Sequence, residues 1–459
     1  MVYFVGVGGI GMSSLARYFC TLGKKVSGYD LTATKLTASL EMEGIEITYT
    51  DSVNTLPGEY LKESSKDEAL VVYTPAIPSD NNILQYFKSG GFRVVKRSQI
   101  LGELVNDARG IAVAGTHGKT SVSSLIAHLL MQTPEGCNGF LGGVAKNYNS
   151  NLLVSPQSDL VVVEADEYDR SFLQLFPCIA VITSMDPDHL DIYGNFENMK
   201  QTFSTFASQV RKGGTIICKK GLDLIYSHNN DINFFDYGID QEADFYAHNI
   251  RISGNGLPVF DLVAQGRYYS DIRLGVPGRF NIENSVAAAA VAILCGAGEQ
   301  AIREGLSSFS GIVRRFEIII NSPDCVLIDD YAHHPAELRA SISAVKEIFP
   351  GRKVTGVFQP HLYSRTRDFA AEFAESLGIL DDVILLDIYP ARELPLPGVT
   401  SEMIFRQVDR DSKIMCSRDQ LPGMISGMHT DVVIMLGAGN IDVMVDPVAA
   451  VLTAKIKKS

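Results

Sequence analysis

The stretch VYFVGVGGIGM, Val2–Met12, joins a short apolar run to a glycine-rich turn. Gly6, Gly8 and Gly11 match the spacing G-x-G-x-x-G, and Asp30 follows nineteen positions after Gly11. A strand that turns through glycines into a helix presents backbone N–H groups and the positive end of the helix to a phosphate group. The stretch therefore predicts a Rossmann-like α/β domain with a diphosphate site. It leaves a nicotinamide-dependent oxidoreductase open as one interpretation.

The composition is that of a globular protein with an acidic surface. The chain has 459 residues, of which 46% are hydrophobic and 20% charged, with a formal net charge of −13. The length predicts about three domains, and the charge disfavours nucleic acid and anionic membranes as partners. The seven cysteines contain no C-x-x-C pair, which favours free thiols in a reducing cytosol.

The apolar segments predict neither a membrane span nor a signal peptide. The longest of them, at 286–297, is shorter than the roughly 18–20 residues that cross a bilayer. The apolar start is too short, too rich in glycine and too poor in positive charge for a signal peptide. We therefore expect a soluble, cytoplasmic protein without membrane insertion.

Valine- and isoleucine-rich runs alternate with helical patterns along the chain, which is typical of α/β architecture with largely parallel sheets. We predict three domains: a Rossmann-like domain over 1–109, a central P-loop-type ATPase domain over 110–312, and a second Rossmann-like domain over 313–459. A polar stretch around Asn106–Arg109 separates the first two, and 309–317 is interpreted as a linker.

A second glycine loop lies in IAVAGTHGKTS, Ile111–Ser121. The apolar run predicts a buried strand, and a helix is expected to begin near Lys119, so that backbone N–H groups there would surround phosphates. Lys119 would reach the β- and γ-phosphates, and the Thr120 hydroxyl would bind Mg²⁺. A strict Walker pattern requires glycine at 113, where the chain has valine, so the match is incomplete.

Two further strands end in acidic residues. Glu164 closes the run DLVVVE, and Asp186, Asp188, His189 and Asp191 follow the run CIAVI. The carboxyl ends of parallel strands are where open α/β sheets bind ligands. A carboxylate and a neutral imidazole there are suitable Mg²⁺ ligands for phosphoryl transfer, so we predict Glu164 and His189 as ligands.

Seven segments resemble, in order, the signatures of the Mur ligase family: GTHGKTS (115–121), EADEYDRSFLQLFP (164–177), TSMDPDHLDIYGN (183–195), GRFNIEN (278–284), RRFE (314–317), DDYAHHPAE (329–337) and FQPHLYSRT (358–366). These ATP-dependent enzymes build the peptide stem of bacterial peptidoglycan, so the resemblance implies a role in cell-wall biogenesis, cell shape and division. The family's shortened phosphate loop also accounts for Val113.

Within the family, GVGGIGM, DDYAHHP and FQPH resemble the member that joins L-alanine to the lactyl carboxylate of UDP-N-acetylmuramate through an acyl phosphate. The implied partners are UDP-N-acetylmuramate, L-alanine and ATP with Mg²⁺, in a monomer or homodimer. A sibling that attaches a tripeptide to the same nucleotide sugar is the second candidate, although its third-domain motif differs from FQPH. Two alternatives from other classes are an oxidoreductase with an accessory NTP site and a non-catalytic nucleotide-regulated module.

The resemblance also implies a role for individual residues. The ATP-binding set comprises Gly115, Thr116, His117, Gly118, Lys119, Thr120, Ser121, Asn281, Asn284, Arg315 and Asp330. The UDP-sugar set comprises Gly6, Gly8, Gly9, Ile10, Gly11, Met12 and Asp30. Tyr331, His361 and Arg365 would face the amino acid, and Thr120, Glu164 and His189 would hold the metal. The residues implied in catalysis are Lys119, His189, Arg315, His334 and His361.

The chain departs from the family pattern at two of these segments. Phe280 stands where the family has histidine, so it can stack on adenine but cannot donate a hydrogen bond to it. Leu362 replaces an arginine, which leaves Arg365 alone to pair with the amino-acid carboxylate. Several family members carry a carbamylated lysine near the metal; Lys200 lies in that region, and we assign it no role.

Overall fold

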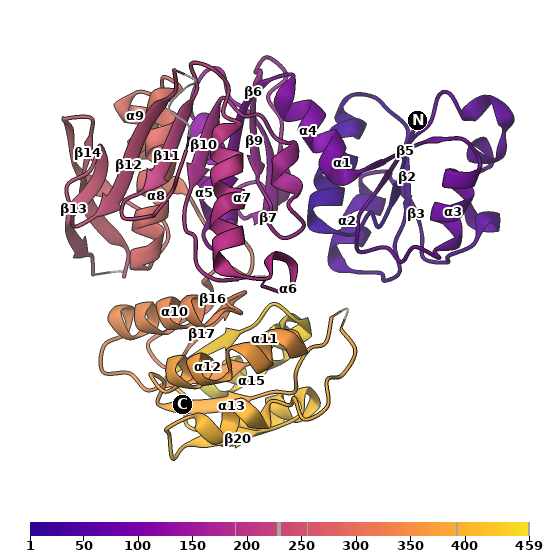
Figure 1. Ribbon diagram of the computed structural model, residues 1–459. Helices are drawn as coiled ribbons and strands as arrows, with labels where there is room; N and C mark the ends of the chain where they lie inside the picture. Colours follow the sequence, from indigo (N-terminus) through magenta and orange to yellow (C-terminus); the bar gives the residue numbers. More distant parts are fainter. Residues whose placement is uncertain (189, 227–230, 255, 392, 458–459) are drawn as a thin grey trace. The chain divides into compact units, whose positions relative to one another are not determined.

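The computed structural model describes residues 1–459 except 189, 227–230, 255, 392 and 458–459. The described residues form three sheets with helices packed on them, which confirms the predicted α/β class (Figure 1). They divide into two compact units. The first comprises Met1–Asn249, Phe260–Ile272 and Glu283–Ser310, and the second comprises Ile250–Val259, Arg273–Ile282 and Gly311–Ser459.

The first sheet is parallel and has the strand order β3-β2-β1-β4-β5 of a Rossmann-like half. Its strands are β1 (Val2–Val5), β2 (Val26–Tyr29), β3 (Glu46–Thr48), β4 (Leu70–Tyr73) and β5 (Arg93–Lys96). Its helices are α1 (Ile10–Thr21), α2 (Lys35–Met42), α3 (Asn82–Ser89) and α4 (Arg97–Asn106). The predicted strand–glycine loop–helix at the start of the chain is β1 followed by α1.

Both faces of this sheet are buried, because successive side chains of a strand point to opposite sides. Phe4 belongs to the same apolar core as Leu15 of α1. Its neighbour Tyr3 packs on the other face against Phe87 of α3, with ring centroids 5.0 Å apart. The near-continuous apolar run of β1 is thus the pattern of a strand covered by helices on both sides.

The central sheet has the order β15-β14-β13-β12-β11-β10-β6-β9-β7-β8 among the described residues. Its strands are β6 (Arg109–Ala114), β7 (Asn138–Ala145), β8 (Ser150–Leu153), β9 (Leu160–Glu164), β10 (Ile179–Ile182), β11 (Thr215–Lys219), β12 (Asn233–Ile239), β13 (Phe245–Ile252), β14 (Pro258–Ala264) and β15 (Arg267–Arg273). The helices are α5 (Lys119–Leu130), α6 (Leu190–Tyr193), α7 (Phe196–Ser208), α8 (Arg279–Leu294) and α9 (Glu299–Ser308). The parallel strands β9, β6 and β10 lie side by side, so their carboxyl ends meet at one edge.

Helix α1 is fastened to the central sheet by a buried polar cluster within the first unit. The Asn151 side chain on β8 donates to the Ile10 carbonyl at 2.6 Å and to Ser13 Oγ at 2.8 Å. Arg17 of α1 donates in turn to the Asn151 side-chain oxygen and pairs with Glu43 at 2.6 Å. These contacts hold the first glycine loop in a fixed position relative to β8.

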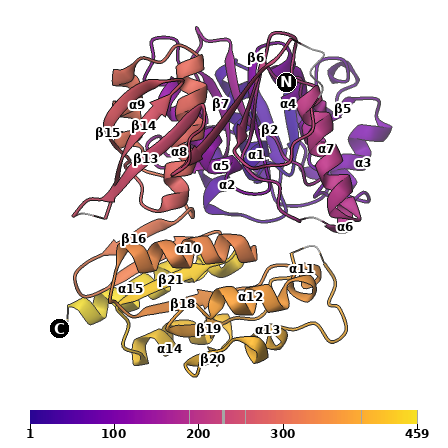
Figure 2. The same cartoon turned by 60° about the vertical axis from the view of Figure 1, so that its left-hand side comes forward.

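The third sheet has the order β16-β17-β21-β18-β19-β20, with an antiparallel edge strand β16 and parallel pairing elsewhere. Its strands are β16 (Glu317–Asn321), β17 (Val326–Asp330), β18 (Val354–Phe358), β19 (Asp382–Leu385), β20 (Lys413–Met415) and β21 (Val432–Leu436). The helices are α10 (Pro335–Ile348), α11 (Tyr363–Asp368), α12 (Ala370–Leu377), α13 (Glu402–Gln407), α14 (Leu421–Gly427) and α15 (Val445–Ile456). Helices α10 and α12 pack side by side on this sheet (Figure 2).

The described part of the chain contains neither a membrane-spanning helix nor a disulfide. None of its helices combines the length and the apolar character that a membrane crossing requires. All seven cysteines are free thiols in the structure.

Candidate active site

The first glycine loop is closed by Asp30. The Gly8 N–H donates to one carboxylate oxygen of Asp30 at 2.8 Å, and the Thr32 N–H donates to the other at 3.2 Å. Gly6 has a φ of +91°, which a residue with a side chain adopts only at a cost. Gly9 caps α1 without a side-chain hydrogen bond, so no side chain of the cap occupies the N–H groups at the helix start. Asp30 therefore holds the turn, and the loop has the glycine conformation that the sequence predicted for a diphosphate site.

Three other members of the predicted UDP-sugar set lie in the first turn of α1. Ile10 accepts the hydrogen bond from Asn151 through its carbonyl, and Met12 is buried in the apolar core. Gly11 lies against the Arg97 guanidinium, because a Cβ on Gly11 would come 2.7 Å from Arg97 Nη1. Of these residues, Met12 packs the core, whereas Gly11 borders a cation that the sequence reasoning did not single out.

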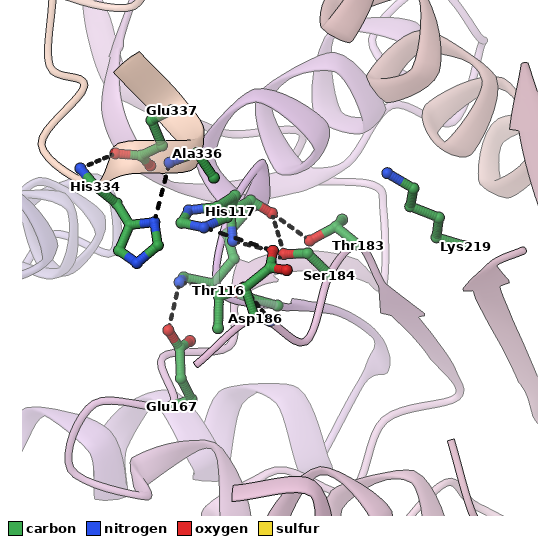
Figure 3. A network of polar contacts seen from close by, with 12 residues as sticks. Thr116, His117, Glu167, Thr183, Ser184, Asp186, Lys219, His334, Ala336 and Glu337 are labelled. Atoms are coloured by element: carbon green, nitrogen blue, oxygen red, sulfur yellow. Dashed lines mark hydrogen bonds and ion pairs between the residues drawn. The ribbon is translucent and has the colours of Figure 1, made fainter. Parts of the chain in front are cut away.

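The second glycine loop turns tightly against the segment after β10 (Figure 3). The Ser184 hydroxyl accepts from the His117 N–H at 2.7 Å and lies 2.9 Å from Thr116 Oγ1. The His117 ring faces Asp186 at 3.6 Å. Gly115 has a φ of +143°, and a Cβ there would come 2.1 Å from Thr183 Oγ1, so only glycine fits. The segment that follows β10 thus fixes the path of the loop.

Helix α5 begins at Lys119, as predicted, and its first two side chains meet acidic residues. Lys119 Nζ donates to Glu167 Oε1 at 2.9 Å and to the Gly115 carbonyl at 2.7 Å. Thr120 Oγ1 donates to Glu164 Oε2 at 2.9 Å. Burial acts to lower the pKa of Lys119, but the carboxylates of Glu167, Glu164 and Asp166 outweigh it and raise the pKa above its ordinary value. Lys119 is therefore a protonated cation at neutral pH.

Glu167 was missed by the sequence reasoning. Its side chain is fully buried beneath the loop, and it is the ion-pair partner of the phosphate-loop lysine. The spacing EADE places it three residues after Glu164, but nothing in that spacing distinguishes a buried partner from a solvated carboxylate. The sequence reasoning did not single out Lys219 either. Its Nζ forms an ion pair with Glu283 Oε2 of α8 at 2.8 Å.

Two of the three predicted metal ligands lie among the residues that the structure describes. Thr120 and Glu164 are in contact, whereas His189 lies outside the described residues. Its neighbour Asp188 is buried, and Asp186 has a half-exposed side chain. Among the described residues, no group of three or more histidine, cysteine or acidic side chains is gathered as a metal site.

The residues predicted for the adenine side divide between the two units. In the first unit, Asn284 lies beside the second loop, since a Cβ on Gly118 would be 3.0 Å from its Oδ1. In the second unit, Asn281 is buried and donates to the Pro277 carbonyl at 2.7 Å. Phe280, the departure from the family pattern, packs edge-on against Phe316 at 5.7 Å.

In the second unit, Arg315 lies over the Tyr331 ring, with its guanidinium carbon 4.8 Å from the centroid. Asp330 is buried at the end of β17 and accepts a hydrogen bond from Ser341; burial raises the pKa of its carboxyl. His334 caps α10, where Pro335 occupies the first helical position. The DDYAHHP segment therefore forms a strand end and a helix start, which is the usual place of ligand-binding residues in a parallel sheet.

Two of the predicted amino-acid residues, Tyr331 and His361, contact histidine and tyrosine rings of the same unit. His361 stacks on Tyr389 at 5.8 Å and meets His333 at 5.9 Å, and His333 lies 5.3 Å from Tyr331. The sequence did not predict His333 and Tyr389, which the structure places against His361. Arg365 is buried in α11, and Leu362 precedes that helix with a φ of +69°.

The chain is similar to known proteins along its whole length. Family models match three consecutive parts of the chain: the Mur ligase family catalytic domain (1–109), the Mur ligase middle domain (113–292) and the Mur ligase glutamate ligase domain (314–439). A protein of Parabacteroides distasonis named UDP-N-acetylmuramate–L-alanine ligase is 52% identical over 457 residues, covering 100% of this chain and 98% of that protein. The chain belongs to the Mur ligase family. This confirms the predicted resemblance.

Other Mur ligase relatives agree with this placement. A protein of the same name from Porphyromonas gingivalis is 50% identical, covering 97% of this chain and 98% of that protein. The crystal structure of UDP-N-acetylmuramate–alanine ligase from Thermotoga maritima matches with a TM-score of 0.82 and 26% identity, over 99% of both chains. A murein peptide ligase from Psychrobacter arcticus matches with a TM-score of 0.68 and 21% identity over 98% of both chains, which shows a shared fold alone.

Proposed function

We propose that this chain joins L-alanine to the lactyl carboxylate of UDP-N-acetylmuramate, with cleavage of ATP to ADP and phosphate, in peptidoglycan synthesis. The observation that carries the proposal is the full-length similarity, at 52% and 50% identity, to two proteins named for this reaction. The site supports it, because a buried lysine cation stands at the start of α5 beside a hydroxyl–carboxylate pair. That arrangement suits a triphosphate.

The chemistry explains why such a site is needed. A carboxylate does not react usefully with an amine in water, since its oxygen is a poor leaving group. In the proposed reaction a carboxylate oxygen attacks the γ-phosphorus and ADP leaves, which gives an acyl phosphate. The amine of L-alanine then attacks the carbonyl carbon, and phosphate leaves with the former carboxylate oxygen. Bringing two anions together requires cations and fixed positions more than covalent help from the protein.

Lys119 is the residue proposed to neutralise the β- and γ-phosphates. In the structure its ammonium is held by Glu167 and the Gly115 carbonyl, so its position is set before nucleotide binds. The N–H groups at the start of α5 add fixed partial positive charge at the same place. Gly115 and Gly118 let the backbone pass close to the phosphates, which is the reason for keeping residues 115–121 as the proposed loop.

Oxygen donors at this loop fit the Mg²⁺ that the family's chemistry implies. Thr120 and Glu164 are in contact at 2.9 Å, and a Cβ on Gly142 would come within 1.7 Å of Glu164 Oε2, so the glycine leaves room for that carboxylate. Hydroxyl and carboxylate oxygens are the ligands Mg²⁺ prefers, and Mg²⁺ bound there would offset the charge of the phosphate oxygens. We propose Thr120 and Glu164 as ligands, with His189 kept from the sequence prediction.

For the remaining residues, the roles implied by the family stay proposals. Arg315 is proposed for the γ-phosphate, Asp330 for the ribose, Asn281 and Asn284 for the adenine side, and His334 or His361 for accepting a proton from the amine. Tyr331, His361 and Arg365 are proposed for the amino acid. Their support is the shared strand ends and ring contacts of the second unit. The domain limits 1–109, 110–312 and 313–459 also stay proposals.

Neither other class of function is favoured. Asp30, the residue that an oxidoreductase would use for a ribose, is engaged with the N–H groups of Gly8 and Thr32. A reaction that consumes ATP and a nucleotide sugar is expected in the cytoplasm, which we keep as the proposed compartment. A monomer or a homodimer stays the predicted state of the chain.

Phosphate release tests the proposed function. We would incubate the purified chain with ATP, Mg²⁺ and UDP-N-acetylmuramate and add L-alanine, glycine, L-serine or the recycling tripeptide in parallel. We expect release that depends on the nucleotide sugar and is fastest with L-alanine. Preference for the tripeptide would favour the sibling reaction, and no release with any amine would refute a ligase.

A further inference from the structure

Arg97 carries a positive charge where a helix does not favour one. It is the first residue of α4, and the N-terminus of a helix is its positive end. Its partner is Asp166, at 3.9 Å, which is the outer limit of an ion pair. Among the described residues it donates no hydrogen bond, although its side chain is only 23% exposed. A weak, half-exposed pair of this kind contributes little to stability, so the fold alone does not explain this arginine.

The surroundings of Arg97 point to an anionic ligand. On one side its guanidinium lies against Gly11, in the first turn of α1, directly after the loop proposed for the diphosphate. On the other side Arg97 and Ser98 line a small open hollow together with Glu164, Asp166, Ser171 and three apolar side chains. Glu164 is in contact with Thr120, next to the phosphate-loop lysine. Arg97 thus stands between the diphosphate loop and the phosphoryl-transfer residues.

The substrate proposed above has an anionic group for each of these two places. Its diphosphate belongs at the loop of α1, and its carboxylate must come to the γ-phosphate near Glu164 and Lys119. That carboxylate would enter a hollow already lined by two carboxylates, Glu164 and Asp166. It therefore needs a cation on the approach from α1, and Lys119 is already engaged with Glu167. Arg97 is the guanidinium in that hollow.

We propose that Arg97 binds the lactyl carboxylate of the nucleotide sugar, exchanging its weak contact with Asp166 for a two-pronged pair with the substrate. A planar guanidinium matches a carboxylate with two parallel N–H···O bonds, which a single 3.9 Å contact does not provide. This inference rests on the proposed function and names a residue that selects its acid substrate. A lysine at the same position would keep the charge and lose the paired geometry.

Binding of two nucleotide sugars tests the proposal. UDP-N-acetylglucosamine keeps the diphosphate and lacks the lactyl group, so the pair isolates the carboxylate. We would measure both by calorimetry with wild type, Arg97→Gln and Arg97→Lys. The matched control is Arg93→Gln, because Arg93 is an exposed arginine four residues earlier that pairs with Glu103 at 3.2 Å.

The proposal predicts that Arg97→Gln weakens UDP-N-acetylmuramate binding by about 10- to 100-fold and changes UDP-N-acetylglucosamine binding by less than about 2-fold. Arg97→Lys should fall between, and Arg93→Gln should match wild type. Retained binding of UDP-N-acetylglucosamine also shows that the variant is folded. An equal loss for both sugars would overturn the proposal in favour of the diphosphate, and no loss for either would remove Arg97 from substrate binding.

The proposed function is judged separately, by the wild-type chain. If wild type releases no phosphate with UDP-N-acetylmuramate and L-alanine, the proposed function fails whatever Arg97→Gln does to sugar binding. If wild type turns over and Arg97→Gln binds UDP-N-acetylmuramate normally, only the inference about Arg97 fails.

Discussion

Replacing Glu167 by alanine removes the carboxylate that faces Lys119 beneath the second glycine loop. The Lys119 side chain is 13% exposed and that of Glu167 is 1% exposed, so the change leaves a buried ammonium with the Gly115 carbonyl as its remaining hydrogen-bond acceptor. Breaking a buried pair from one side costs about 3–5 kcal/mol in the free energy of unfolding. Glutamine, which still accepts a hydrogen bond, should cost less, about 1.5–3 kcal/mol.

Calorimetric unfolding measures this effect. For a domain of this size, each kcal/mol lowers the melting temperature by about 2–4 °C, so Glu167→Ala should melt roughly 6–20 °C below wild type. ATP should raise the melting temperature of the variant more than that of wild type, because its phosphates restore the missing negative charge beside Lys119. Magnesium and nucleotide concentrations are kept equal in both scans.

The control is Glu197→Ala, which removes a carboxylate from an exposed pair with Lys200 at 2.9 Å. Such a pair is worth at most about 1 kcal/mol, so this variant should melt within about 4 °C of wild type. If Glu167→Ala melts like Glu197→Ala, Glu167 does not hold Lys119, and the account of a preset lysine is wrong. The same conclusion would follow if ATP stabilised the variant no more than wild type.

Three further predictions concern single side chains. Lys119→Ala should lower ATP-dependent phosphate release by about 10²–10³-fold and leave UDP-N-acetylmuramate affinity within about 3-fold, because the only substrate groups that Lys119 is proposed to contact are the ATP phosphates; comparable turnover would contradict its role. Arg365→Ala should raise the KM for L-alanine at least about 10-fold while the KM for ATP changes by less than about 3-fold, since a carboxylate pair is lost on one substrate only; an unchanged KM for L-alanine would exclude Arg365 from that site. Burial lowers the pKa of His128 to about 4, so the unfolded chain takes up a proton below pH 6.5 while the folded chain does not. Stability should therefore fall by about 2 kcal/mol between pH 7 and pH 5 through this group. His128→Gln should lose that part of the pH dependence of unfolding, and an unaltered pH profile would show that His128 titrates normally.

The two glycine loops could be predicted from the sequence because their backbone requires glycine. Gly6 and Gly118 adopt positive φ values, and Gly115 has no room for a Cβ, so each position leaves a visible mark in the chain. The apolar strands β1 and β6 before them are buried, α1 follows the first loop, and α5 begins at the expected place. Local rules therefore sufficed for the fold around both loops.

Long-range partners could not be predicted in the same way. Glu167 and Lys119 are 48 residues apart, and only the packing of α5 on β9 brings them together. His361 and Tyr389 stack although each is an ordinary ring in its own segment. Arg97 belongs to no sequence motif, and only its contacts with Gly11 and Asp166 in the folded chain indicate a role for it.

The strands β12 to β15 were also absent from the sequence prediction. Strands β12, β13 and β15 carry many exposed or half-exposed side chains, as in β15, where five of seven residues are exposed. The continuous apolar runs that identify β6 and β9 are therefore missing from them. Their place in the central sheet follows from pairing with neighbours, as in the parallel register of β11 with β12.

The transfer of oxygen tests the central claim most directly. UDP-N-acetylmuramate with ¹⁸O in both lactyl carboxylate oxygens is incubated with ATP, Mg²⁺, L-alanine and the wild-type chain, and the released phosphate is analysed by mass spectrometry. Because a carboxylate oxygen attacks the γ-phosphorus and leaves with it, each phosphate should carry one ¹⁸O, and one UDP-N-acetylmuramoyl-L-alanine should form for each phosphate. Phosphate without ¹⁸O would mean that water attacks ATP, and the acyl-phosphate ligase would be contradicted.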